Sequence, residues 1–279
     1  MKINLAKSAG FCFGVKRAID ISFQTIGSRK NVYMLGDIVH NEEVARQMQE
    51  SGLKKIKRLT RGENKTLLIR AHGVSLGLLN KARTLGYRIV DTTCPMVKEI
   101  HKTASDMQNS GYKIIVIGDK KHDEVRGIVG QLKKKAIVID SPRGLLLEKI
   151  KKIKKAAIVV QSTQNIEKVM KIVALLKPRI RELKFFNTIC KPTSIKQQEI
   201  KNMPRENDVM VIIGSKTSAN TKRLFEISKT LNKRSFWVQK SKDLRPDWFK
   251  SAQSVGISAG ASTPDRAIRE IVECIKGLA

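Results

Sequence analysis

Aromatic residues, acidic residues and cysteines are all scarce in this sequence. Phe, Trp and Tyr make up 5% of its 279 residues, and no RNP-like or zinc-finger spacing is present, so the usual equipment for specific reading of nucleic acid is missing. No apolar run approaches the roughly 20 residues that cross a bilayer. The first residues also lack the apolar segment of a signal peptide. We therefore expect a cytoplasmic protein with no membrane partner and no specific nucleic-acid partner.

Several short motifs of common sites are absent as well. There is no C-x-x-C pair, which argues against a structural zinc ribbon, and no G-x-x-x-x-G-K-[ST] loop of the Walker A type. We expect no disulfides among the four cysteines, because the cytosol keeps thiols reduced. Packing, metal binding or catalysis is left to explain them.

Positive charge, by contrast, is abundant. The sequence has 55 Lys and Arg against 25 Asp and Glu, a formal net charge of +30. Such an excess attracts nucleic acid, anionic substrates or an acidic protein partner. The alternative is that these residues only form solvated helix faces, and composition alone does not decide between the two.

Short β-branched runs alternate with amphipathic helical patterns along the chain. This rhythm predicts an α/β fold with mainly parallel sheets. The expected strands are 112–119, 135–140, 156–161, 208–214 and 254–260. The expected helices are 15–26, 42–51, 75–86, 96–110, 165–177, 194–203, 219–232 and 263–277.

Three cysteines are spread almost evenly through this rhythm. Cys12, Cys94 and Cys190 each precede an expected helix, whose N-terminus favours the thiolate form that metals require. Three similar βα segments could therefore each supply one thiol to a common centre. Taken singly, each cysteine is more often a small buried apolar residue. Cys274 lies in the apolar register of the last helix, where packing is its expected role.

Three thiolates on one iron-sulfur cluster would leave one iron without a protein ligand, which is typical of a catalytic site. Polar residues that follow strand-like runs fit such a site, since α/β proteins bind ligands at strand ends: His40, His72, and His122 with Glu124. Each histidine alone would more often be a surface or capping residue.

A second group of candidates is rich in hydroxyls. Ser162 follows an apolar run, and Ser215, Ser218, Asn220 and Ser262 lie between an expected strand and the start of an expected helix. Backbone N–H groups and the helix dipole bind phosphate well at that position. Ordinary N-capping is the alternative for each loop.

Taken together, these segments resemble the 4-hydroxy-3-methylbut-2-enyl diphosphate reductase family. The matching segments, in chain order, are GFCFGVKRAI, VHN, AHGV, DTTCPMVKEIH, HDEVRG, GSKTSANTKRL and AGASTPD. The resemblance implies a trefoil of three α/β domains around a central iron-sulfur cluster. We place these domains at 13–94, at 95–188, and at 189–279 together with 1–12.

The resemblance also implies the roles of individual residues. Cys12, Cys94 and Cys190 would bind one 4Fe-4S cluster, and Glu124 would be the catalytic proton source. The expected substrate-binding residues are His40, His72, His122, Ser162, Ser218, Asn220 and Ser262. The implied reaction is the reductive removal of the 4-hydroxyl of the allylic diphosphate to give isopentenyl and dimethylallyl diphosphate, the last step of the non-mevalonate isoprenoid pathway.

Electrons for this reaction would come from outside, since no dinucleotide-binding G-x-G-x-x-G loop is present. A ferredoxin or flavodoxin-type donor is implied, and the +30 charge could serve its docking. The chain departs from the family pattern at Ser162, where Thr is usual, and at Lys196, where the charge is kept without the planar fork of Arg.

Two other classes of protein are alternatives. A basic nucleic-acid-associated protein could use a cluster or zinc structurally, and it would then need metal to fold and would not need Glu124. A plain phosphate-binding α/β protein with cysteines in its core would be colourless and free of metal.

Overall fold

The computed structural model describes residues 1–144 and 150–278. The contacts between residues divide the chain into two compact units. Unit 1 comprises Met1–Lys16, Val39–Gln47 and Lys191–Ala279, and unit 2 comprises Arg17–Ile38 and Met48–Cys190. Helices α1 (Phe13–Ser28) and α2 (Glu42–Glu50) begin in unit 1 and continue in unit 2.

Unit 1 is built on one four-stranded parallel sheet, in the order β1-β12-β10-β11. Its strands are β1 (Lys2–Leu5), β10 (Val209–Ile213), β11 (Ser235–Val238) and β12 (Ser254–Ala259). Its helices are α8 (Lys191–Glu206), α9 (Ala219–Leu231) and α10 (Asp265–Lys276), with short 3-10 helices η3 (Ser241–Asp243) and η4 (Pro246–Phe249).

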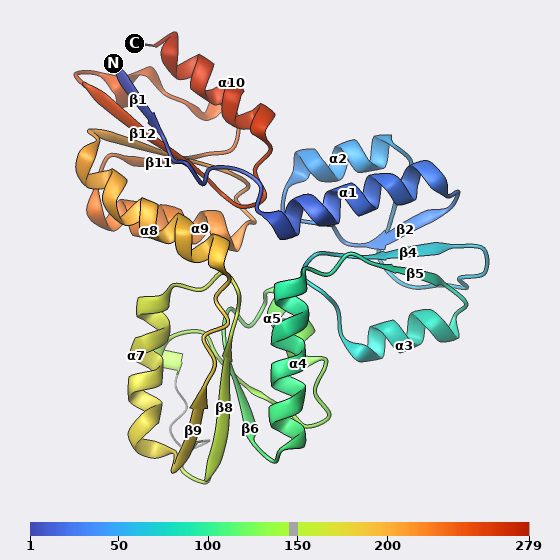
Figure 1. Ribbon diagram of the computed structural model, residues 1–279. Coiled ribbons are helices and arrows are strands. Elements are labelled where there is room, and N and C mark those ends of the chain that lie inside the picture. The colour runs from blue at the N-terminus through green and yellow to red at the C-terminus, as the bar shows by residue number, and fades with distance from the viewer. Residues whose placement is uncertain (145–149, 279) are drawn as a thin grey trace. The chain divides into compact units, whose positions relative to one another are not determined.

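Both faces of this sheet are covered by helices. The central strand β10, with the sequence VMVII, is accordingly apolar at every position. Val211 and Ile213 of β10 pack in one cluster with Ile268 of α10. Met210 and Ile212 point to the other face and pack with residues of α8 and α9. Figure 1 shows α10 on one side of the strands and α8 and α9 on the other.

The first sheet of unit 2 is also four-stranded and parallel, in the order β3-β2-β4-β5. Its strands are β2 (Val32–Leu35), β3 (Lys54–Ile56), β4 (Thr66–Ile69) and β5 (Arg88–Asp91). Leu67 and Ile69 of β4 pack with Ala82 of α3 (Leu76–Thr84), which covers one face.

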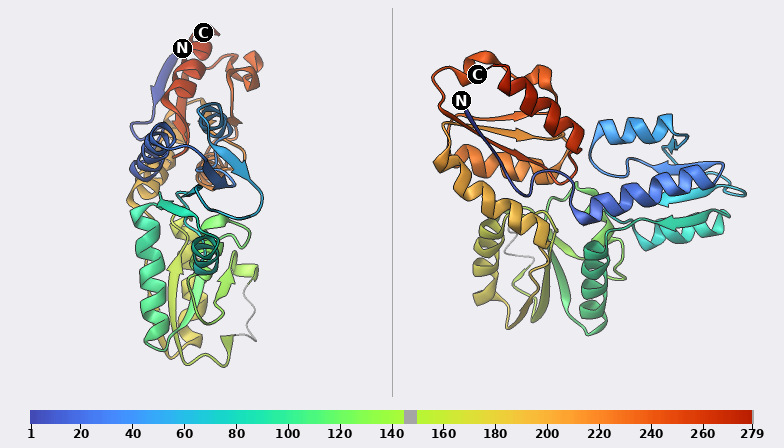
Figure 2. Two further views of the ribbon diagram at one scale, coloured as in Figure 1. Left: turned by 90° about the vertical axis from the view of Figure 1, so that its right-hand side faces the viewer. Right: turned by 45° about the horizontal axis from the view of Figure 1, so that its top comes forward.

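The second sheet of unit 2 has the order β7-β6-β8-β9 and is parallel throughout. Its strands are β6 (Lys113–Ile117), β7 (Ile137–Ile139), β8 (Lys155–Val160) and β9 (Glu182–Phe185). Its helices are α4 (Pro95–Asn109), α5 (Asp123–Val129) and α7 (Ile166–Leu176), with η1 (Pro142–Gly144) and η2 (Lys177–Arg179). Helices α4 and α5 pack on one face and α7 on the other. The right-hand view of Figure 2 shows the green α4 and the yellow α7 on opposite sides of the strands.

The predicted fold class is therefore confirmed, since every strand pair in the three sheets is parallel. All five expected strands and all eight expected helices are present, with shifts of a few residues at their ends. The sequence pattern missed β1 to β5, β9, β11 and the seven-residue helix α5. Among the described residues, no helix combines the length and the apolar character that crossing a membrane requires.

Candidate functional site

The three sheets share one strand arrangement, and one cysteine occupies the same place in each. In each sheet, one of the two edge strands is followed by a cysteine. Cys94 follows β5, Cys190 follows β9 and Cys12 follows β1. Each cysteine comes directly before a helix: α4, α8 and α1, respectively. The internal repetition suggested by the even spacing is thus present in the topology.

The backbone of each cysteine makes the same hydrogen bond. Cys94 N donates to Ala71 O at 3.0 Å, Cys190 N to Ser162 O at 3.1 Å and Cys12 N to Ala261 O at 3.2 Å. Each acceptor is the second residue beyond the end of the neighbouring strand, β4, β8 or β12. Parallel pairing brings the carboxyl ends of two neighbouring strands to one edge, which sets each thiol beside the polar residues at that edge.

All four cysteines are half-buried thiols. Cys94 is the N-cap residue of α4 but makes no capping hydrogen bond with its side chain, and Pro95 occupies the first helical position. A thiol at a helix N-terminus lies at the positive end of the helix dipole, where the thiolate is favoured. Cys274 lies instead near the end of α10, outside this arrangement.

Glu124 is the most deeply buried acid of this region, with 1% of its surface exposed. It lies in the first turn of α5. One carboxylate oxygen accepts a hydrogen bond from Ser162 N at 2.6 Å, and the other accepts one from Ser162 Oγ at 2.8 Å. Burial raises the pKa of Glu124, and the two bonds from Ser162 oppose that rise without cancelling it. A carboxyl whose pKa is raised keeps its proton more readily than an exposed one, which suits a proton donor.

Ser162 connects this acid to a cysteine. Its N–H and hydroxyl both donate to Glu124, while its carbonyl accepts the N–H of Cys190. Ser162 keeps the hydroxyl of the threonine that is usual at this position, and that hydroxyl binds Glu124. The missing methyl group takes no part in these hydrogen bonds.

His122 begins the same helix that carries Glu124. It is the N-cap of α5, and its Nδ1 accepts a hydrogen bond from Glu124 N at 3.2 Å. When the ring is neutral, its proton is therefore on Nε2. The ring of His72 meets that of His122 edge-on, with 5.3 Å between centroids.

An ion pair supports this pair of histidines. Arg70 Nη1 lies 2.6 Å from Asp123 Oδ2, and about a fifth of each side chain is exposed. Arg70 stands two residues before His72, and Asp123 lies between His122 and Glu124. The pair thus fastens the loop after β4 to the start of α5.

In unit 1, the polar residues follow β10 and β12. Ser262 is buried, and its hydroxyl donates to the backbone oxygen of His40 at 3.1 Å. Ser218 is the N-cap of α9 and accepts from Thr221 N. Ser218 therefore has the N-capping role that was the alternative for these hydroxyls. Because its oxygen is the acceptor in that bond, its hydroxyl hydrogen can still donate a hydrogen bond to a ligand.

Asn220 differs from these capping residues. Its side chain is 4% exposed, and neither its amide oxygen nor its amide nitrogen has a hydrogen-bond partner among the residues that the structure describes. Buried amides are rarely left unpaired in folded proteins. This amide is consequently a strong candidate for binding a ligand.

Two glycines hold this segment in place. A Cβ on Gly214, which has a φ of 150°, would lie 2.5 Å from Thr221 Oγ1, and a Cβ on Gly260 would collide with the same atom. Thr221 thus fits between the ends of β10 and β12, and it fixes Asn220, its neighbour in α9.

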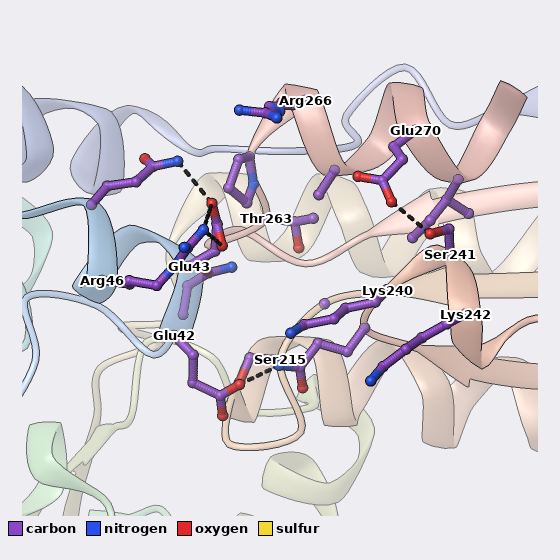
Figure 3. Close-up of a pocket in the computed structure, with 17 residues that line it drawn as sticks. Glu42, Glu43, Arg46, Ser215, Lys240, Ser241, Lys242, Thr263, Arg266 and Glu270 are labelled. Carbon is purple, nitrogen blue, oxygen red and sulfur yellow. Dashed lines mark hydrogen bonds and ion pairs between the residues drawn. The ribbon is translucent and has the colours of Figure 1, made fainter. Parts of the chain in front are cut away.

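Unit 1 also contains a pocket of about 410 Å³ at the carboxyl ends of its strands. Figure 3 shows that basic and acidic side chains are mixed around it, among them Lys240, Arg266, Glu43 and Glu270. Arg46, together with the more distant Arg266, lowers the pKa of Glu43, so this acid stays ionised. Mixed charge makes the pocket a poor receptor for a diphosphate, and its described lining does not include Ser218, Asn220 or Ser262.

The structure therefore places the predicted site residues in two groups. Unit 2 contains Cys94, Cys190, His72, His122, Glu124 and Ser162. Unit 1 contains Cys12, His40, Ser218, Asn220 and Ser262. Sequence reasoning missed the Arg70–Asp123 pair, although both residues lie in segments that it singled out. It also assigned no contact to Lys196, which is buried near Cys12.

Comparisons with known proteins agree with this construction. A family model described as "LytB protein" matches residues 3–276. The chain belongs to the LytB family. A 4-hydroxy-3-methylbut-2-enyl diphosphate reductase of Geotalea uraniireducens is 38% identical over 99% of this chain and 97% of its own length. The enzyme of the same name from Aquifex aeolicus is 37% identical, over 96% and 94%.

Solved structures of LytB-type enzymes extend the similarity to the fold. One is described as (E)-4-hydroxy-3-methyl-but-2-enyl diphosphate reductase, the terminal enzyme of the non-mevalonate pathway. It matches with a TM-score of 0.74 and 36% identity, over 99% of this chain and all of that one. The Plasmodium falciparum E-1-hydroxy-2-methyl-but-2-enyl-4-diphosphate reductase matches with a TM-score of 0.91 and 26% identity, over 98% and 87%. The predicted family is thereby confirmed.

Proposed function

We propose that this chain is a 4-hydroxy-3-methylbut-2-enyl diphosphate reductase. It would remove the allylic hydroxyl of its substrate and release isopentenyl and dimethylallyl diphosphate. The observation that carries the proposal is the pairing of the buried Glu124 with Ser162, whose carbonyl binds the N–H of Cys190. A buried acid that Ser162 links to the backbone of a proposed cluster ligand can supply protons to a reduction at that cluster. Relatives that carry this enzyme name match almost the whole chain, which supports the same reading.

In this proposal, Cys12, Cys94 and Cys190 hold one 4Fe-4S cluster. The donor set suits the group, because thiolates are the usual protein ligands of such clusters. The three equivalent backbone hydrogen bonds support a shared role for these residues. So does the buried ammonium of Lys196, which has no carboxylate within ion-pair distance among the described residues and lies near Cys12. When bound, the cluster would supply the electrons for the reduction.

The diphosphate would be held by the donors at the strand ends: His40, Ser218, Asn220 and Ser262 of unit 1, and His72 and His122 of unit 2. Hydroxyl, amide and imidazole groups can all donate hydrogen bonds to phosphate oxygens. The unpaired amide of Asn220 supports this assignment, because a phosphate oxygen would satisfy its nitrogen.

Glu124 would hold the proton for the reaction. The overall change consumes two electrons and two protons and releases one water. The carboxyl of Glu124 would deliver a proton from the oxygen that contacts Ser162 Oγ, and the hydroxyl of Ser162 can pass a proton because it both donates and accepts. The substrate's own anionic charge would disfavour the carboxylate further and keep the acid protonated until it acts.

The electrons would come from a small acidic donor of the ferredoxin or flavodoxin type, in the cytoplasm. The net charge of +30 supports electrostatic attraction to such a partner. We also propose that the segments 13–94, 95–188 and 189–279 with 1–12 act as domains, each containing one of the three sheets.

Anaerobic purification followed by iron and sulfide analysis tests the cluster, and reduction of the allylic diphosphate with a chemical reductant tests the reaction. Glu124→Gln should keep iron and substrate binding and lose nearly all turnover. Cys94→Ala should lose iron, whereas Cys274→Ala, which alters the cysteine outside the arrangement, should not. A wild-type protein without iron, or a Glu124→Gln variant with normal turnover, would contradict the proposal.

A further inference from the structure

Unit 1 buries a lysine beside the first cysteine. Lys196 lies in the second turn of α8, and only 2% of it is exposed. Lysine is almost never this buried unless its charge is paired. Among the described residues, however, no carboxylate lies within ion-pair distance of its ammonium. Its position therefore needs an explanation beyond packing.

The ammonium of Lys196 is used to hold the loop that leads to Cys12. Nζ donates to Gly10 O at 3.0 Å, to Ala259 O at 3.2 Å, and to Ser8 O. Ser8 and Gly10 belong to the loop between β1 and Cys12, and Ala259 is the last residue of β12. One cation thus ties the loop that leads to Cys12 to the end of β12.

Glu199, one turn further along α8, binds the same loop between β1 and Cys12. Its carboxylate accepts hydrogen bonds from the N–H of Ser8, at 3.1 Å, and from the hydroxyl of Ser8. Gly10 adapts the loop to this grip, since its φ is 96° and a Cβ there would lie 2.9 Å from Asp265 Oδ1. The loop is therefore fixed by α8 through one positive and one negative side chain.

The charge balance around Lys196 favours an additional negative charge nearby. The three hydrogen bonds that Nζ donates to carbonyl oxygens require three N–H groups, so the side chain is an ammonium in this arrangement. The carboxylate of Glu199 on the same helix holds Ser8 and lies outside ion-pair distance of that ammonium. A buried cation stabilises anions in its surroundings far more strongly than an exposed one, because water does not screen it.

We propose that Lys196 is a positioning residue of the iron-sulfur site, which fixes the Cys12 loop and stabilises the reduced, more negative state of the cluster with its charge. This inference rests on the proposed function, because it requires a cluster bound by Cys12. Reduction adds one electron from an external low-potential donor and forms or breaks no bond at Lys196. A fixed positive charge therefore favours the product of that step.

The magnitude follows from Coulomb's law. A unit charge about 10 Å from the added electron, at an effective dielectric constant of about 20, changes a one-electron equilibrium roughly tenfold. Loss of the Lys196 charge should thus lower the ratio of reduced to oxidised cluster about tenfold at a fixed potential, or about 59 mV in midpoint potential. Removing the charge of Glu199 should raise the same ratio, by a smaller factor.

The experiment is a redox titration of the anaerobically reconstituted full-length protein, followed by electron paramagnetic resonance, with iron and sulfide measured in each sample. The variants are Lys196→Met, Lys196→Gln, Lys196→Arg and Glu199→Gln. Lys7→Gln is the matched control, because Lys7 is exposed in the same loop. We expect the Met and Gln variants to shift downward, Arg to stay near wild type, Glu199→Gln to shift upward, and the control to stay within about twofold.

A Lys196→Met or Lys196→Gln protein with normal iron and an unchanged potential would overturn the inference. If both neutral variants fail to fold or to bind iron, Glu199→Gln decides, and an unchanged or lower potential in that variant would overturn it. A purely structural role would lower iron content or stability in the Lys196 variants without any upward shift in Glu199→Gln. Wild-type protein that binds no cluster would instead refute the proposed function itself.

Discussion

Replacing Glu124 by Gln should make the protein more stable at neutral and alkaline pH while removing its activity. An ionised carboxylate can accept about four hydrogen bonds, but Glu124 accepts two, both from Ser162, at 1% exposure. No cation lies within ion-pair distance of it in the described chain. The neutral amide of Gln keeps the shape of the acid, and it avoids the burial of an ionised group.

The free-energy difference can be bounded from these contacts. A buried polar group that lacks its partners destabilises a protein by about 1–3 kcal/mol. Glu124→Gln should recover an amount of that order at pH 8. Each kcal/mol corresponds to roughly 2–4 °C in the melting temperature of a large domain, so the variant should melt several degrees above wild type.

The sign of the pH dependence follows from the raised pKa of Glu124. Below about pH 4.3, the ordinary value for a glutamic acid, the carboxyl is protonated in both the folded and the unfolded chain, and the two proteins should differ little. As the pH rises above that value, the unfolded chain loses its proton first, so wild-type stability falls until the pH passes the pKa of the folded state. The gap between variant and wild type should widen over this window and then level off.

Melting curves between about pH 5 and 8.5, on protein prepared identically, measure this gap. Glu99→Gln is the control, because Glu99 is an exposed acid of α4. If the difference in melting temperature does not grow with pH, or if the variant is less stable than wild type at pH 8, burial does not destabilise the ionised form of Glu124.

Four further predictions concern other parts of the chain. Gly73→Ala should destabilise the protein by about 1–3 kcal/mol in urea titrations, because Gly73 has a φ of 72° and an added Cβ would lie 2.7 Å from His101 Cε1. Gly77→Ala, where the added Cβ meets nothing within 4 Å, should be neutral or stabilising. His101→Gln should flatten the loss of stability between about pH 6.5 and 4. The reason is that burial lowers the pKa of His101 to about 4, so the unfolded chain binds the extra proton there and wild type weakens as pH falls. Asn220→Ala should raise the KM for the diphosphate several-fold with little change in melting temperature, because its amide has no partner in the described protein; an unchanged KM would remove Asn220 from the site. Turnover with a ferredoxin-type donor should fall steeply from about 0.05 to 0.3 M salt, whereas turnover with a small chemical reductant should not; equal salt dependence would argue against electrostatic docking.

The sequence predicted the long elements well, because their apolar periodicity is strong. Strands β6, β8, β10 and β12 are buried on both faces and read as continuous apolar runs. The missed strands are three or four residues long, and the edge strand β3 has the sequence KKI. Such segments gain their structure from neighbouring strands and not from their own composition. Helix α5 was missed because seven residues give too few turns for a periodic pattern.

The candidate site could be predicted from resemblance, but its contacts could not be predicted from spacing. The hydrogen bonds of Lys196 join residues that are 186 or more positions apart for Ser8 and Gly10, and three backbone carbonyls leave no pattern in a sequence. The Arg70–Asp123 pair is equally invisible, because it depends on which strand ends meet. The retained charge at position 196 was the available signal, and only the structure shows what that charge touches.

The shared order of the three sheets explains why residues so distant in sequence are brought together. In each sheet the two central strands are not consecutive: β2 pairs with β4, β6 with β8, and β10 with β12. An edge strand flanks each central pair on either side, and α/β sheets bind ligands at the carboxyl ends of such central strands. The predicted site residues outside the cysteines all follow one of these six strands: His40, His72, His122, Glu124, Ser162, Ser218, Asn220 and Ser262. The edge strand beside β4, β8 or β12 then adds a cysteine that is hydrogen-bonded to the same strand end. A sequence shows that a strand is followed by a polar residue, but it does not show which strand is its neighbour. The strand pairing in each of the three sheets determines that neighbour. It gives Cys12, Cys94 and Cys190 the same place beside a strand end, whereas Cys274 lies in a helix.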